Sequence, residues 1–185
     1  MKRTLYSLAA LILCVCSMSA KKASGELASL KAFLQQPAME AATNAEALGI
    51  SNLNDPSSWT GVVISNGHVK EIKWDGKKLA GSLTLSNMPL TAVNAGRNRI
   101  SQFSCTGTPM LQNLLLYRNR LSSIDLGAVP MLKRLNISSN SMAALDVSNA
   151  ANLETLNCSS NRMEELAVSG CKNLKNLYAS FNELT

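Results

Sequence analysis

Residues 109–171 divide into three rows of 21 residues: PMLQNLLLYRNRLSSIDLGAV, PMLKRLNISSNSMAALDVSNA and ANLETLNCSSNRMEELAVSGC. Leucine stands at the third and sixth places of every row, and asparagine stands at the eleventh. The pattern continues for one row before this stretch and for part of a row after it. A fixed period of this length predicts a repeat architecture, in which each repeat is one small unit that packs on the next.

The eleventh-place asparagines form a ladder along the chain: Asn98, Asn119, Asn140, Asn161 and Asn182. Here the chain should turn away from a strand, so that some backbone groups lose their sheet partners. A side-chain amide can both donate and accept hydrogen bonds at such a turn. We therefore predict a structural role for the ladder, and a cost of about 1–3 kcal/mol for losing a buried member.

The sixth to eighth places are typical of a short strand. Alternation predicts that Leu114 and Leu116 point inward and that Asn113, Leu115 and Tyr117 point outward. Strands of neighbouring repeats should stack in parallel, roughly 4.8 Å apart, because one repeat cannot bury its apolar face alone. The back half of each row also alternates, as in the letters IDL and LDV, which favours a second short strand over a helix.

Residues 21–66 precede the repeats and are predicted to form a cap. The segment ELASLKAFLQQP has its apolar residues on one helical face and a proline at its end. We predict a second short helix at about 38–48, a core position for Trp59, and a hairpin turn at Asn66-Gly67.

Residues 67–185 are predicted to form the repeat array. Its first unit, 67–87, is degenerate, because Lys77 holds the asparagine place and two leucines fall out of phase; a terminal unit is expected to be atypical. The other units are 88–108, 109–129, 130–150, 151–171 and the partial unit 172–185. The array stops halfway through a repeat, so we expect either a longer protein or a partner that covers residues 181–185.

Residues 1–20, MKRTLYSLAALILCVCSMSA, have the basic start, apolar stretch and small residues of a secretory signal. The apolar stretch is too short to cross a bilayer as a helix. Cys14 or Cys16 could carry a lipid anchor, although the bulky Leu13 and Val15 before them argue against it. The sequence therefore predicts an exported protein, either secreted or held at a bacterial cell surface.

The net charge of the chain is too small to indicate nucleic-acid binding. The 185 residues carry a formal charge of +6. Without Lys2 and Arg3 this becomes +4, because 16 basic residues then face 12 acidic ones. So mild an excess is far below the basic footprint of a nucleic-acid-binding domain.

Few residues of the sequence suggest catalysis or metal binding. Cys105, Cys158 and Cys171 lack metal-ligand spacing, and we interpret them as small core residues. His68 is the single histidine, and we interpret it as a solvated turn residue. The sequence therefore predicts no catalytic residue, no cofactor, no metal site and no small-molecule substrate.

The pattern L-x-x-L-x-L-x-x-N-x-L resembles the leucine-rich repeat. The LDL-type back half is similar to the 21-residue bacterial repeats called IRREKO and to internalin-type arrays. The first 66 residues, with LKAFLQQ and DPSSW, look like the N-terminal cap of secreted or surface leucine-rich-repeat proteins of Bacteroides-like bacteria. The resemblance implies a leucine-rich-repeat solenoid: a right-handed, β-rich horseshoe of short parallel strands behind a small helical and hairpin cap. It also implies binding through the concave strand face, with no catalytic residues.

The outward strand places and the turns beside them supply the candidates for partner binding. They are Arg97, Arg99, Asn113, Leu115, Tyr117, Arg118, Arg120, Arg134, Asn136 and Tyr178. Arg97 and Arg118 hold the tenth place of adjacent repeats, and Arg99 and Arg120 the twelfth. These four should form one basic patch suited to carboxylates or sulfates. The alternative is a charged rim without a ligand.

The predicted function is non-catalytic binding of a protein or an acidic glycan. The alternatives are the recognition front end of a longer secreted enzyme, and a structural spacer. Asn136 and Asn157 also match the N-x-S glycosylation sequon, which we attribute to the asparagine- and serine-rich composition of the strands.

Overall fold

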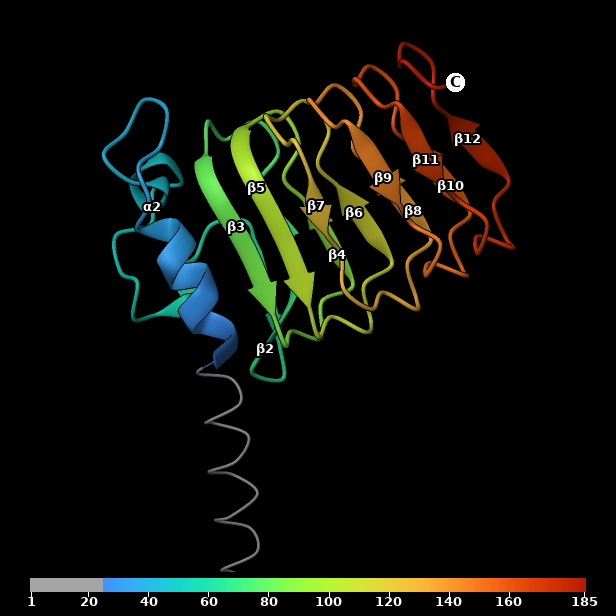
Figure 1. Cartoon of the computed structure of the whole chain (residues 1–185). Coiled ribbons are helices and arrows are strands. Elements are labelled where there is room, and N and C mark those ends of the chain that lie inside the picture. Colours follow the sequence, from blue (N-terminus) through green and yellow to red (C-terminus); the bar gives the residue numbers. More distant parts are fainter. Residues whose placement is uncertain (1–24) are drawn as a thin grey trace, which may run out of the picture.

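The computed structural model describes residues 25–185, which form a β-solenoid of about five turns (Figure 1). The expected signal segment, with its two cysteines, lies outside these residues. Each turn adds one short strand to the same long sheet, and the chain then returns along the opposite side of the stack. The prediction of a β-rich repeat solenoid with a small helical N-terminal region is confirmed.

The main sheet has seven strands in the order β1-β2-β4-β6-β8-β10-β12. Their bounds are Val62–Ser65, His68–Lys73, Ala92–Asn94, Asn113–Leu115, Arg134–Asn136, Thr155–Asn157 and Asn176–Tyr178. From β2 to β12 all neighbours are parallel, whereas β1 runs antiparallel to β2. Leu114 lies opposite Leu135 and Leu135 opposite Leu156, so the pairing register equals the period of the sequence.

The returning side of the stack contains shorter strands, as the alternating back halves predicted. One sheet has the order β3-β5-β7 and another pairs β9 with β11. These strands span Ala80–Ser86, Arg99–Thr106, Ile124–Asp125, Ala144–Asp146 and Glu165–Ala167. The pairing of β3 with β5 shifts register between Gly81 and Ser82. This irregularity accommodates the degenerate first unit, because Leu83 and Leu85 are fully buried although they are out of phase in the sequence.

The three cysteines of the array fill the core, as predicted. Cys105 and Cys158 are fully buried and Cys171 nearly so, and none is in a disulfide. Burial raises the pKa of the Cys105 thiol to about 11, and it also raises the pKa values of Cys158 and Cys171. Because the thiolate is the nucleophilic form, these side chains are poor nucleophiles at neutral pH.

Each ladder asparagine joins its own turn to the turn before it. In Asn161, Nδ2 donates to the carbonyl of Ile137, 24 residues earlier, at 3.1 Å and to that of Cys158 at 3.0 Å. Its Oδ1 accepts the backbone N–H of Met142 at 3.0 Å. The other four members make the same set of contacts: Asn98, Asn119, Asn140 and Asn182.

The residue before each ladder asparagine has a left-handed backbone. The tenth-place φ angle is 53° at Arg97 and 52° at Arg118, and the later turns have the same conformation at Ser139, Ser160 and Phe181. This conformation turns the chain out of the strand, so that the asparagine that follows faces the interior. It is unfavourable for residues with a Cβ by about 1–2 kcal/mol. The first turn instead has Gly76 at this place, where the conformation carries no such cost.

The N-terminal cap packs its helix against the first turns, with one correction to the predicted pattern. A helix spans residues 25–34 and lies beside β3 in Figure 1. The second helix, predicted at 38–48, is limited to α2, Asn44–Ala47, with Thr43 as its N-cap. The stretch before it forms bends because backbone and side-chain groups there bond to the solenoid, as Met39 N–H does to the carbonyl of Lys78.

The cap also confirms two predictions. Trp59 is 2% exposed and follows the short 3₁₀ helix η1, Pro56–Ser58. Asn66 and Gly67 have φ angles of 52° and 74°, which are those of a hairpin turn joining β1 to β2.

Two amide side chains of the cap satisfy the free edge of β3. Asn44 donates to the carbonyl of Ala80 at 2.9 Å and accepts the Ala80 N–H at 3.1 Å. Gln36 does the same with Ser82, at 2.9 and 2.7 Å. The edge strand therefore exposes fewer backbone groups that could pair with another chain.

The last turn of the described chain is the most exposed part of the array. Leu177 and Leu184, which hold places that are buried in earlier turns, are 45% and 41% exposed, and Phe181 is 82% exposed. No further turn packs on them within residues 25–185.

Replacing Asn161 by alanine should lower the free energy of unfolding by about 1–3 kcal/mol, because two buried carbonyls and one buried N–H lose their partner. Urea denaturation would measure the loss. Asn152→Ala is the matched control, since Asn152 is exposed and its two side-chain bonds, to the carbonyl of Pro130 and from Asn173, are exposed as well. Equal losses in both variants would contradict the structural role of the ladder.

Replacing Asn44 by alanine should also cost about 1–3 kcal/mol, because Asn44 is fully buried and its loss leaves both backbone groups of Ala80 unpaired. If the cap amides protect the edge of β3, hydrogen exchange in Asn44→Ala should be faster than in the wild type at β3 and unchanged at β10. Unchanged protection of β3 would show that the helix alone, without the amide bonds, covers this edge.

Candidate functional site

The outward side chains of the main sheet form one continuous surface, which we call the strand face. It consists of the fifth, seventh and ninth places of each turn from β4 to β12. Asn113, Leu115 and Tyr117 are half-buried on this face, Arg134 is exposed, and Tyr178 is 54% exposed. These side chains point outward, as the alternation of the sequence predicted.

Three residues from three successive turns are tied together at one edge of the strand face. The Arg97 guanidinium forms an ion pair with the Asp75 carboxylate, and its Nε donates to Asp75 Oδ1 at 3.2 Å. The Tyr117 hydroxyl donates to the same oxygen at 2.9 Å. A Cβ placed on Gly96 would lie 2.5 Å from the Tyr117 ring. Tyr117 therefore reaches Asp75, two turns away, by lying directly over a glycine.

These contacts set the electrostatics of the cluster. The hydrogen bond from Arg97 is the main cause that lowers the pKa of Asp75, with a further contribution from Tyr117. Burial is the main cause that raises the pKa of Tyr117, followed by its hydrogen bond to Asp75. Asp75 is thus a carboxylate, and it offsets the charge of Arg97.

The ion pair with Asp75 removes one of the four arginines, Arg97, from the predicted basic patch. Arg97 and Arg99 flank the inward-turned Asn98, and all four arginines are exposed, including Arg118 and Arg120. Because Arg97 already has a carboxylate partner, it is less available to a ligand. Among the described residues, Arg99, Arg118 and Arg120 have no acidic side chain at ion-pair distance.

Farther along the strand face, two asparagines bond to the serines that follow them. Asn136 Oδ1 accepts the N–H of Ser138 at 3.0 Å and its hydroxyl at 2.8 Å. Asn157 Oδ1 accepts the N–H and hydroxyl of Ser159 at 3.1 and 2.7 Å. In the structure, these two N-x-S segments form the same side-chain turn in two adjacent strands.

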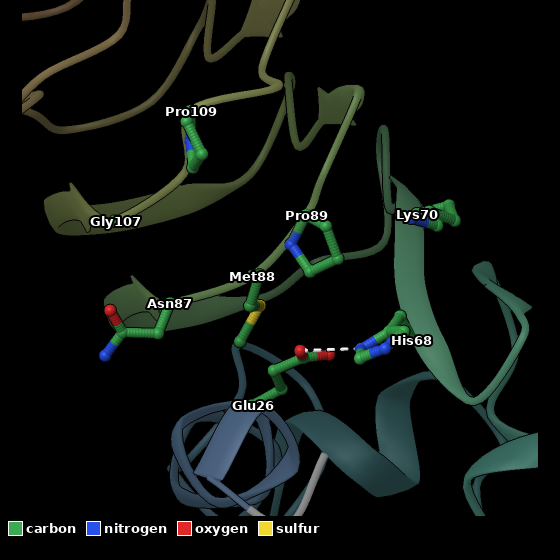
Figure 2. Close-up of a pocket in the computed structure, with 8 residues that line it drawn as sticks. All are labelled: Glu26, His68, Lys70, Asn87, Met88, Pro89, Gly107 and Pro109. Carbon is green, nitrogen blue, oxygen red and sulfur yellow. Dashed lines mark hydrogen bonds and ion pairs between the residues drawn. The ribbon is translucent and has the colours of Figure 1, made fainter. Parts of the chain in front are cut away.

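A pocket of about 360 Å³ lies away from the strand face, between the cap helix and the ends of the first turns (Figure 2). Its lining residues are Glu26, His68, Lys70, Asn87, Met88, Pro89, Gly107 and Pro109. The Glu26 carboxylate faces the His68 ring, with 2.9 Å between Oε1 and Nδ1.

The interpretation of His68 as a solvated turn residue was wrong. Its side chain is 29% exposed and its partner Glu26 is 1% exposed. Glu26 also accepts the Val69 N–H, at 3.4 Å. The partner is 42 residues away in the sequence, so no local pattern could have indicated the contact. The pair joins the cap helix to β2, which gives it a structural role.

Neither a scan against protein-family models nor a search of curated proteins found a match for this chain. Between residues 25 and 185, no helix has both the length and the apolar character needed to cross a membrane.

The Asp75 cluster allows a direct test by titration. Asp75→Asn should lower the pKa of Tyr117, because the acceptor of the tyrosyl proton loses its charge. In the wild type, the pKa of Tyr117 is higher in the folded state than its unfolded value near 10, so folding favours the neutral phenol. The free energy of unfolding should therefore fall as the pH rises from the unfolded pKa to the folded pKa of Tyr117. NMR of ring-labelled tyrosine would follow the titration. An unchanged pKa in Asp75→Asn would mean that the hydrogen bond does not hold in solution.

Proposed function

We propose that this chain is a non-catalytic recognition module of the leucine-rich-repeat type, exported to the cell surface or beyond. It holds a protein or glycan partner against the strand face. The proposal rests on the contrast between the two sides of the main sheet. Inward places repeat the same apolar residue types from turn to turn, whereas outward places vary in charge, size and polarity.

A rigid surface with varied side chains is suited to selective binding. The strand positions are held by the sheet and by the asparagine ladder, so the outward groups keep their spacing without a partner. Association then costs little ordering of the backbone. A structural spacer would need no such variety, and the polar contacts that fix Tyr117 would serve no purpose in it beyond stability.

The resemblance of the repeats to IRREKO and internalin-type arrays supports this function, as does the secretory character of residues 1–20. The same chain could serve as the recognition part of a longer secreted enzyme. In that case the partner of the strand face would be the polymer or surface on which the enzyme acts.

A screen of the chain against extracellular proteins and glycans would test the proposal with two matched variants. Leu115→Arg adds a charged, bulky group to the centre of the strand face. Ala144→Arg adds the same group to β9, on the opposite side, where the residue is exposed. We expect Leu115→Arg to weaken binding by at least about tenfold, as loss of a central contact does, and Ala144→Arg to leave it unchanged.

The reverse result, with binding sensitive only to Ala144→Arg, would place the partner on the returning side. A partner that is indifferent to both variants would leave the strand face without a role.

A further inference from the structure

The amides of Asn136 and Asn157 have a fixed orientation on the strand face. Each Oδ1 faces the backbone N–H of a serine. A backbone N–H can only donate, so the atom that it faces must be the amide oxygen and not the nitrogen. The serine hydroxyls donate to the same oxygens. Both Nδ2 groups therefore point away from these turns, and neither has a hydrogen-bond acceptor among the described residues.

These amides stand next to each other. Asn136 lies opposite Asn157, and Arg134 lies opposite Thr155, with roughly 4.8 Å between the two strands. Each Nδ2 provides two N–H donors. Arg134 lies on the same face of β8, two residues before Asn136, and adds a guanidinium. The block thus presents two fixed amide groups beside a guanidinium, all of them donors, and this favours a ligand that is rich in acceptors.

The charges around the block are mainly positive. Lys133 and Arg134 are exposed at the start of β8. Glu154 lies beside them and forms an ion pair with Lys175, at 3.0 Å. Lys175 is the main cause that lowers the pKa of Glu154, and Lys133 and Arg134 contribute. The single carboxylate is therefore outnumbered by three cations, which favours an anionic ligand.

The chemistry of this part of the face suits a sugar better than a protein. The fifth, seventh and ninth places of its two turns hold only Arg134, Asn136, Ser138, Thr155, Asn157 and Ser159. Protein interfaces usually place aromatic or other large apolar anchors at their centre, and this block has none. On the next strand, Tyr178 lies opposite Asn157. Its ring is half-exposed and offers a flat surface at the rim, against which a sugar ring can pack.

We propose that the donor block, which comprises Arg134, Asn136, Thr155 and Asn157 with Tyr178 at its rim, binds an acidic polysaccharide. The carboxylate or sulfate of one sugar unit accepts hydrogen bonds from the two Nδ2 groups and from Arg134, and the polysaccharide chain runs across the strands toward Tyr178. This inference rests on the proposed function and names the class of partner.

The double variant Asn136→Asp/Asn157→Asp provides the sharpest test. Aspartate keeps the oxygen that accepts from each serine, but it replaces the outward donor by an anionic oxygen. The full chain and the variant would be titrated with oligogalacturonate, with heparin-derived oligosaccharide and with a neutral cello-oligosaccharide. The full chain should bind at least one of the two acidic sugars at least tenfold more tightly than the neutral one. The variant should lose at least tenfold in that affinity, with an unchanged melting temperature.

Asn94→Asp is the control for general charge repulsion, because it adds the same charge to the strand face on β4, two strands from β8. The Oδ1 of Asn94 likewise accepts a backbone N–H, that of Gly96 at 3.3 Å. Binding should be retained in this control. The preference between galacturonate and heparin shows whether the anionic group is a carboxylate or a sulfate. A poly-glutamate peptide, as a fourth probe, should bind less tightly than the preferred acidic sugar.

Three outcomes would overturn the inference: no binding of either acidic sugar, equal binding of the neutral sugar or of poly-glutamate, or equal losses in Asn94→Asp and the double variant. If the double variant unfolds, Arg134→Gln replaces it, and unchanged affinity in that variant likewise counts against the block. A partner that depends on Leu115 but not on these residues would leave the proposed function intact and remove only the sugar assignment.

Discussion

The solenoid depends on the way in which each turn satisfies the backbone groups of the turn before it. At the end of every short strand, the carbonyls and N–H groups face the interior without a sheet partner. One asparagine amide supplies both kinds of bond, and it reaches back by 24 and 19 residues while also closing its own turn. Aspartate has no donor, and serine has too few groups to bridge two turns. Because each amide bonds backward, stability passes from one turn to the next along the stack.

This backward direction explains the degenerate first unit. An asparagine at position 77 would have no earlier turn to bond, and Lys77 instead provides an N–H to Asn98 Oδ1, at 3.1 Å. In the cap, amide side chains satisfy the backbone groups at the free edge of β3 in the same way. Gln36 and Asn44 each bond to both the N–H and the carbonyl of one β3 residue. The cap is thus a substitute for the missing earlier turn.

Much of the fold could be predicted from the sequence, because period and alternation encode the inward and outward places directly. The hairpin at Asn66-Gly67 and the burial of Trp59 also follow from local chemistry. The site was less predictable. The contact of Asp75 with Tyr117 requires a glycine between them in space, and the Glu26–His68 pair joins residues 42 apart. Contacts of this kind depend on which turns become neighbours and on which residues lie between them. The period indicates that a side chain points outward, but not toward which neighbour it then extends.

The same hydrogen-bond rules decide which polar groups of the strand face remain available to a partner. Near the cap, Asp75 pairs with the guanidinium of Arg97 and accepts from the hydroxyl of Tyr117, so these three side chains already bond to one another. Toward β8 and β10 the serines donate only to the oxygens of the two asparagines, so the amide nitrogens have no acceptor within residues 25–185. The face therefore changes from internally paired to rich in donors within two turns. A polar ligand gains most where fixed donors have no other acceptor, since binding there breaks no internal contact. For this reason the anion-binding site that we propose lies at the asparagines of β8 and β10 and not at the arginines that the repeat pattern emphasised.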